Sequence, residues 1–127
     1  MATTCPMNFN VGYLRDQVRS TYDQVARDPN RHYHFHRGPD YAHSFLGYDR
    51  NELAALPALS TERFAGVGNP LAIGPLEPGE TVLDHACGAG MDLLLAARRV
   101  GPGGHTIGID MTPAMVECAR MAADQAG

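Results

Sequence analysis

The stretch Val82–Asp92 reads VLDHACGAGMD and determines the fold class that the sequence predicts. An apolar run rich in β-forming residues, TVLDHA, leads into a glycine turn, and the turn leads into MDLLLAARRV, which predicts a helix. The order then repeats, because the turn PGGH precedes the short run TIGID and a helix that starts at Thr112-Pro113. Strands that alternate with helices indicate a parallel sheet, so we expect an α/β fold over residues 75–127.

The preceding residues, 1–74, predict a unit of short helices with irregular joins. Apolar residues at helical spacing predict a helix over residues 12–26, which Asp28-Pro29 ends. Further short helices are expected over residues 39–45 and over residues 51–56, the second preceded by an N-cap at Asp49. Another is expected from an N-cap at Ser60 to Phe64, and a last one within the segment FAGVGNPLAIG. We therefore predict a helical N-terminal cap over 1–74 and a second unit over 75–127.

The composition excludes several classes of protein. Apolar residues make up 44% of the chain and charged residues 19%, as in a globular domain. The net charge of −4 gives no broad basic face, so we expect no nucleic-acid partner. No apolar run is long enough to cross a membrane, and the N-terminus does not have the pattern of a signal peptide. The three cysteines are an odd, widely spaced set, which predicts reduced thiols in a cytoplasmic protein.

The glycine turn predicts a cofactor cradle. At Gly88 and Gly90 a ligand can lie against the backbone, because no Cβ intervenes. The turn does not match the glycine pattern of dinucleotide-binding folds, because Leu93 occupies the position of the third glycine. In addition, the carboxylate of Asp84 would face the negatively charged pyrophosphate of a dinucleotide. Asp84 instead suits a cation, such as the ammonium and sulfonium groups of S-adenosylmethionine, and Asp110 suits ribose hydroxyls. The alternative is a surface turn at which both aspartates are ordinary helix caps.

The segment VLDHACGAGMDLLLAARRVGPGGHTIGIDMTPAMVECAR resembles class I S-adenosylmethionine-dependent methyltransferases, most closely the arsenite methyltransferase-like branch. Upstream, a V-R-x-x-Y helix, a His/Phe-rich loop, L-G-Y and F-A-G-V-G-N-P extend the resemblance back to about Val18. It implies a Rossmann-like fold whose N-terminal loops cover the cofactor. The resemblance also implies roles for individual residues. Asp110 would hold the ribose of the cofactor, and Met111 would pack against its adenine. The methionine end of the cofactor would be bordered by Asp84, Ala86, Cys87, Gly88, Gly90 and Asp92, and the cofactor would be covered by Gly66, Gly68 and Asn69.

The sequence departs from the family pattern in three ways. Ala86 replaces the first glycine of the strand-end motif D-x-G-x-G-x-G, which is tolerable at negative φ and costly at positive φ. Family members bind arsenic through cysteine thiolates, but upstream of the first strand this chain has only Cys5, so no residue supports arsenic chemistry. The family's sheet has seven strands and we expect two here. Three explanations of the missing strands are open: the chain is a fragment, a partner supplies the other strands, or two copies of the chain complete each other's sheet.

The histidines and cysteines leave alternatives open. His32, His34 and His36 alternate, so in an extended segment they share one face and offer a weak metal site, to which His43 could be added. The preferred interpretation is a hydrogen-bonded or solvated loop and no metal. Cys87 lies near a helix N-terminus, which would lower its pKa and make it reactive, or it is a small packing residue. Cys118 is expected in packing or at the surface.

Three hypotheses of function follow. The first is methyl transfer from S-adenosylmethionine to a small-molecule acceptor, where His34, His36 and Tyr41 are weak candidates for the catalytic residue. The second is a non-catalytic, truncated methyltransferase-like module that binds a partner or self-associates through its sheet edge. The third is a nucleotide-binding regulator, for which NAD or ATP would compete with S-adenosylmethionine.

Overall fold

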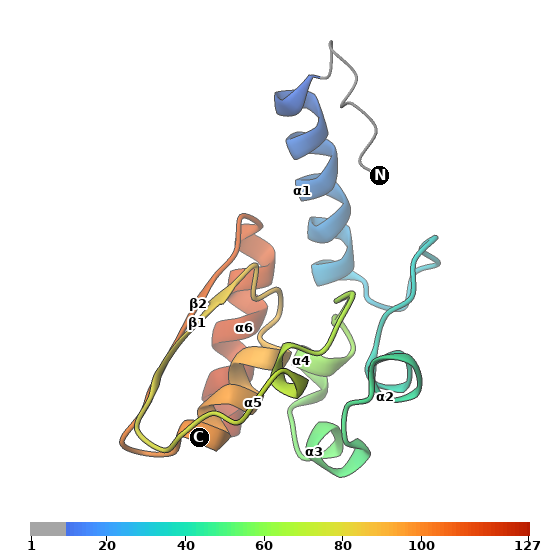
Figure 1. The fold of residues 1–127 in the computed structure, drawn as a ribbon. Helices are drawn as coiled ribbons and strands as arrows, with labels where there is room; N and C mark the ends of the chain where they lie inside the picture. The colour runs from blue at the N-terminus through green and yellow to red at the C-terminus, as the bar shows by residue number, and fades with distance from the viewer. Residues whose placement is uncertain (1–9) are drawn as a thin grey trace, which may run out of the picture.

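The computed structural model describes residues 10–127 (Figure 1). The N-terminal helices come first, followed by two strands that alternate with two helices. The elements are α1 (Val11–Arg27), α2 (Pro39–Leu46), α3 (Arg50–Ala54), α4 (Ala58–Thr61), the 3-10 turn η1 (Pro70–Ala72), β1 (Thr81–His85), α5 (Met91–Val100), β2 (His105–Ile109) and α6 (Pro113–Ala126). The predicted α/β class, with helices before a small incomplete sheet, is confirmed.

The strands β1 and β2 are parallel and in register from Thr81 opposite His105 to His85 opposite Ile109. Helix α5 packs on one face of this sheet, where β2 has a glycine. A Cβ at Gly108 would lie only 2.8 Å from Leu93 Cδ2 and 2.9 Å from Cys87 Sγ, so the missing side chain allows this close packing. Alternate strand residues stay exposed, as the 60% exposure of Leu83 shows.

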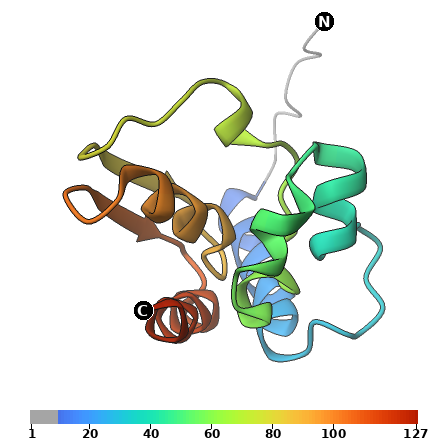
Figure 2. The same ribbon diagram turned by 90° about the horizontal axis from the view of Figure 1, so that it is seen from below.

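Figure 2 shows the sheet with α5 on one side of the molecule and α2, α3 and α4 on the other. Two apolar clusters pack the helices of the molecule together. One contains Tyr48, Leu53 and Phe64 with Met91 and Leu95 of α5. The other contains Val25 and Ala26 of α1 with Met115 and Cys118 of α6. Helix α1 therefore packs through its C-terminal end, and its N-terminal end extends away from the rest of the molecule (Figure 1).

Most predicted helices form where the sequence places them. The Asp49 carboxylate caps α3 and accepts hydrogen bonds from the N–H groups of Asn51 and Glu52 at 2.8 and 2.9 Å. The predicted cap at Ser60 is wrong, because α4 begins at Ala58 behind Pro57 and ends before Phe64. The Ser60 hydroxyl donates to the Pro57 carbonyl over 2.8 Å instead of accepting from an N–H group of the first turn.

The buried face of α6 consists of Met115, Cys118, Ala119 and Ala122, whereas Ala126 is exposed. Cys87 and Cys118 are free thiols, and Cys5 lies outside the described residues. Within residues 10–127, no helix combines the length and the apolar character needed to span a membrane.

Candidate functional site

A cavity of about 660 Å³ lies at the carboxyl ends of β1 and β2. This is the edge at which open parallel sheets usually bind their ligands. The glycine turn, the start of α5 and the start of α6 form one part of its wall, and α1 with residues 63–67 forms another. Of the residues predicted from the sequence, those that line it are Gly66, Asp84, Ala86, Cys87, Gly88, Asp92, Asp110 and Met111.

Asp84, the first predicted acid, is the penultimate residue of β1 and has an unpaired side-chain oxygen. Its Oδ2 atom is buried and has no hydrogen-bond partner among the described residues. Burial raises the pKa of Asp84 above its ordinary value, the neighbouring carboxylate of Asp110 raises it further, and His85 opposes the shift. A buried carboxylate oxygen that no protein group satisfies is an acceptor available to a cationic ligand in the cavity.

Asp110, the second predicted acid, connects the end of β2 to the glycine turn. Its Oδ2 accepts a hydrogen bond from the Gly88 N–H over 2.9 Å, and its Oδ1 accepts one from the Thr112 N–H over 2.8 Å. Each carboxylate oxygen has two lone-pair directions, so each can still accept a second bond. Asp110 therefore fixes the turn and keeps acceptor capacity towards the cavity.

The three small residues of the turn differ in what they do. Ala86 has a φ of +65° and is the only described non-glycine residue with a positive φ. This is the costly case for a residue with a Cβ. Gly88 has a φ of +53° and an added Cβ would meet nothing within 4 Å, so it leaves open space at the cavity. Gly90 does not line the cavity. An added Cβ there would lie 3.2 Å from Ala119 Cβ, so Gly90 serves the packing of the turn on α6.

Cys87 is a packed thiol at the cavity wall. Its N–H donates to the Ile109 carbonyl over 3.0 Å, which extends the ladder between the strands. Burial raises the pKa of the Cys87 thiol to about 11, and the carboxylates of Asp84 and Asp110 add to the shift. The reactive-thiol alternative, which needs a lowered pKa, is therefore wrong, because burial and two nearby negative charges raise the pKa of this thiol. The packing alternative is consistent with this environment.

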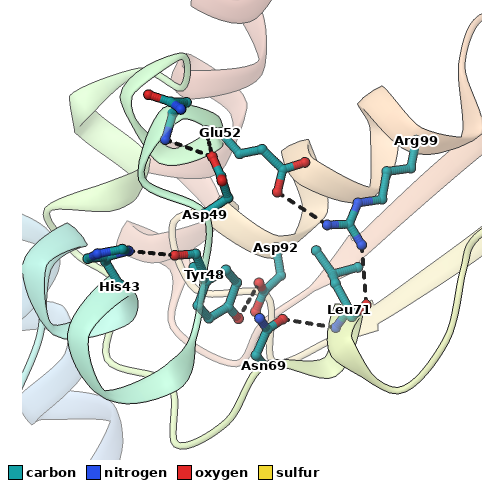
Figure 3. Close-up of polar contacts among 9 residues, drawn as sticks. His43, Tyr48, Asp49, Glu52, Asn69, Leu71, Asp92 and Arg99 are labelled. Carbon is teal, nitrogen blue, oxygen red and sulfur yellow. Dashed lines mark hydrogen bonds and ion pairs between the residues drawn. The ribbon is translucent and has the colours of Figure 1, made fainter.

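Asp92 is joined to the N-terminal helices through Tyr48 (Figure 3). The buried Tyr48 hydroxyl donates to Asp92 Oδ1 over 2.6 Å and lies 3.2 Å from the Gly68 carbonyl oxygen. Burial raises the pKa of Asp92 to about 6, the charge of Asp84 adds to this, and the Tyr48 hydrogen bond opposes it. Burial and the same aspartates also raise the pKa of Tyr48, so this hydroxyl stays protonated and acts as a donor.

The predicted covering loop approaches the cavity with only part of its length. Gly66 lines the cavity, and its carbonyl accepts a hydrogen bond from the Tyr41 hydroxyl over 3.1 Å. Gly68 and Asn69 do not line it. The Asn69 side chain instead accepts from the Leu71 N–H over 3.1 Å and caps the 3-10 turn (Figure 3).

The weak catalytic candidates lie outside the cavity wall. His36 stacks on Tyr41 and Phe45 with ring centroids 5.5 and 5.7 Å apart, and His34 packs edge-on against Phe35. Within residues 10–127 no three His, Cys, Asp or Glu side chains are placed to hold a metal ion. The alternation of His32, His34 and His36 therefore does not build a three-histidine group.

Several residues at the cavity were not predicted from the sequence. His85 lines it beside Asp84, and Arg63 lines it while its Nε donates to the Ala26 carbonyl over 2.7 Å. Val18 and Tyr22 line it from α1. Their four-residue spacing places them on one helix face, and that signal was present in the sequence, whereas nothing local pointed to Arg63.

The chain was compared with known proteins. Residues 76–127 match the family described as "Methyltransferase domain". The arsenite methyltransferase of Halobacterium salinarum is 52% identical over 75 residues, which are 59% of this chain and 19% of that protein. Aklanonic acid methyltransferase DauC of Streptomyces sp. strain C5 is 43% identical over 70 residues, 54% of this chain and 32% of that protein. Ribosomal protein L11 methyltransferase of Cupriavidus necator is 50% identical over 50 residues, 39% of this chain and 16% of that protein.

The chain thus spans 16% to 32% of the length of these relatives. No solved structure matches it significantly. The resemblance to class I methyltransferases that the sequence predicts is confirmed over the C-terminal part of the chain.

Proposed function

We propose that this chain is the S-adenosylmethionine-binding part of a methyltransferase that acts on a small molecule, a proposal supported by the match of residues 76–127 to the methyltransferase domain family. The observation that carries the proposal is the buried, unpartnered Oδ2 of Asp84 at the cavity. A cationic ligand there would satisfy an oxygen that is otherwise desolvated without compensation.

The residues at the cavity fit this cofactor. Asp84 would accept from the ammonium group, and the open space at Gly88 would admit the ligand close to the backbone. Asp110 would accept from the ribose hydroxyls with its remaining lone pairs, while Met111, 44% exposed beside it, would pack against the adenine. The cavity of about 660 Å³ is within the size range of small-ligand sites.

The chemistry that the cofactor supplies when bound is a methyl group on a positively charged sulfur. The contribution of this chain is to bind and orient, since alignment of the reacting atoms accounts for much of the rate in such a transfer. Tyr48 holds the Asp92 carboxylate at the start of α5, and Asp110 holds the glycine turn against β2. His85 lines the cavity and His34 and His36 do not, so His85 replaces them as the candidate for moving a proton.

A small-molecule acceptor is favoured over arsenite. Of the similar proteins, aklanonic acid methyltransferase is named for an organic small molecule, arsenite methyltransferase for arsenite, and ribosomal protein L11 methyltransferase for a protein. Among residues 10–127, the only cysteine at the cavity is Cys87, a thiol whose raised pKa of about 11 keeps it protonated at neutral pH. A single neutral thiol does not make a thiolate site for arsenic.

Competition tests this function against a nucleotide-binding regulator. Binding of S-adenosylhomocysteine to the chain is measured by equilibrium dialysis, with a hundredfold excess of S-adenosylmethionine, ATP or NAD as competitor. We expect S-adenosylmethionine to displace the bound ligand and ATP and NAD to leave it in place. Displacement by ATP or NAD would instead favour the regulator.

A second candidate function is a module that binds a partner or a second copy. The observation that favours it is the exposed apolar face of the sheet, where Leu83 is 60% and Ile107 is 51% exposed. Sedimentation at increasing protein concentration tests self-association. The substitution Leu83→Lys should abolish any dimer that forms through this face.

A further inference from the structure

The cavity has a second wall that the cofactor residues do not explain. Val18 and Tyr22 of α1, with Phe64 and Val67 of the covering loop, line it with aliphatic and aromatic surface. All the carboxylates at the cavity come from the strand ends and the start of α5, and none comes from these four residues. Arg63 and Ser60 also line this second side, where the Arg63 Nε donates to the Ala26 carbonyl over 2.7 Å. The cavity is therefore divided in its chemistry, with one acidic side and one side that is apolar except for Arg63 and Ser60.

The apolar surface of α1 continues out of the cavity into solvent. Val11 and Leu14 lie seven and four residues before Val18, on the same helix face. They are 59% and 44% exposed, while the buried residues of α1 are Val25 and Ala26 at its other end. The N-terminal end of α1 extends away from the rest of the molecule (Figure 1). An apolar strip thus runs from the cavity to open solvent, along which an apolar compound could enter.

The aromatic rings of the second wall indicate the shape of the ligand. Tyr22 and Phe64 are planar surfaces, and offset or edge contacts between aromatic rings add to the stabilisation that burial of their area gives. The Phe64 ring is fixed, because Tyr48 packs edge-on against it with centroids 5.5 Å apart. The Tyr22 ring packs against the Phe35 ring in a tilted arrangement, with centroids 6.2 Å apart. Fixed rings favour a rigid planar ligand over a long flexible one.

Resting on the proposed function, we propose that the second wall, Val18, Tyr22, Phe64 and Val67, binds the methyl acceptor and selects an uncharged, ring-bearing apolar small molecule. The acidic side of the cavity then holds the cationic cofactor, and the acceptor lies against α1. The two ligands differ in charge and shape, so each fits only its own side.

The methionines of the cavity provide the test. Met111 and Met115 line it together with Met91, whereas Met121 is 48% exposed on α6 and does not. The whole chain is labelled with carbon-13 at the methionine methyl groups and titrated with 2-naphthol, with S-adenosylhomocysteine and with arsenite. We expect 2-naphthol to shift Met115 saturably and to leave Met121 unchanged, and we expect arsenite to shift neither.

Matched variants distinguish binding at this wall from nonspecific apolar binding elsewhere on the surface. Val67→Gln changes a residue that is 95% exposed, so it leaves the fold intact and should weaken 2-naphthol binding at least threefold. Ile73→Gln changes an equally apolar residue, 90% exposed and away from the cavity, and should not alter binding. Equal weakening by both variants, or equal shifts of Met115 and Met121, would overturn the proposal.

The titrations also separate this proposal from the proposed function. A response to S-adenosylhomocysteine without one to 2-naphthol would overturn the acceptor wall and leave the cofactor site standing. A response to 2-naphthol alone would contradict the cofactor site and leave a ring-binding wall. The absence of a chemical-shift change with either ligand would overturn both the acceptor wall and the cofactor site.

Discussion

The hydroxyl of Tyr48 donates a hydrogen bond to Asp92 Oδ1 over 2.6 Å, across 44 residues of sequence. This bond connects the N-terminal helices to the first turn of α5, beside the cavity (Figure 3). The same hydroxyl lies 3.2 Å from the Gly68 carbonyl oxygen. One buried side chain therefore fixes a carboxylate at the site and also holds the loop that approaches it.

Replacing Tyr48 by Phe should destabilise the chain by about 1.5–3 kcal/mol, because it leaves a partly buried charge without its donor. Urea unfolding at pH 7.5 measures this. Tyr41→Phe is the matched control, since its hydroxyl donates to the neutral Gly66 carbonyl and its loss should cost about 0.5–1.5 kcal/mol. Equal losses for the two variants would mean that the charge of Asp92 does not strengthen the bond.

Asp92 makes stability depend on pH. Its pKa in the folded chain is raised from 3.8 to about 6, so between these values the folded state binds more protons than the unfolded state. The contribution of Asp92 to the stability of the chain is therefore most favourable below pH 4, and it is lost as the pH rises through 6. The full effect is about 3 kcal/mol at most, which partial exposure reduces to roughly 2 kcal/mol.

Asp92→Asn keeps an acceptor for Tyr48 and removes the charge. We expect it to stabilise the chain by roughly 1–2 kcal/mol at pH 7.5 and to have little effect at pH 4. Chemical unfolding at several pH values checks both the sign and the window. A variant less stable than the parent chain at pH 7.5 would show that ionised Asp92 is compensated in the folded state.

Ala86 holds a backbone conformation that favours glycine, with a φ of +65°. Ala86→Gly should stabilise the chain by about 0.5–1 kcal/mol, since relief of about 1–2 kcal/mol of strain exceeds the entropic cost of glycine. Ala123→Gly, at an exposed position in α6, is the control and should destabilise by about 1 kcal/mol. Thermal unfolding of both variants gives the comparison, and a loss of stability in Ala86→Gly would refute the strain.

The glycines of the turn should respond differently to alanine. Gly90→Ala combines positive φ with a Cβ 3.2 Å from that of Ala119, so it should cost about 2–4 kcal/mol of stability. Gly88→Ala meets no atom within 4 Å and should cost about 1–2 kcal/mol, from its φ alone. Unfolding curves measure both, and equal losses would contradict the division of roles between packing and ligand space.

Much of the fold was predictable from the sequence, because it depends on local signals. The apolar runs and the glycine turn of VLDHACGAGMD predicted β1 and α5, and the Thr112-Pro113 start predicted α6. The cap at Asp49 was also predictable from residue type and spacing. The prediction at Ser60 was wrong, because its hydroxyl donates to the Pro57 carbonyl and α4 begins about one turn earlier, directly after Pro57.

The site was predictable only where one short segment builds it. Asp84, Gly88 and Asp110 follow from the turn and the strand ends, which parallel pairing brings to one edge. The positive φ of Ala86 could not be read from an alanine, and Gly90 looked identical to Gly88 although it packs on Ala119. The pairing of Tyr48 with Asp92 depends on how the N-terminal helices pack on α5, for which no local pattern exists.

The central claim is that Asp84 provides the carboxylate for a cationic cofactor, and calorimetric titration with S-adenosylhomocysteine tests it most directly. The comparison uses the parent chain, Asp84→Asn and the control Asp124→Asn, which removes an exposed carboxylate on α6. Asp84→Asn removes a desolvated charge, so it should fold at least as stably as the parent. We predict saturable binding that Asp84→Asn weakens at least tenfold and Asp124→Asn leaves unchanged. Binding that Asp84→Asn leaves intact, or no binding by the parent chain at millimolar ligand, would contradict the account.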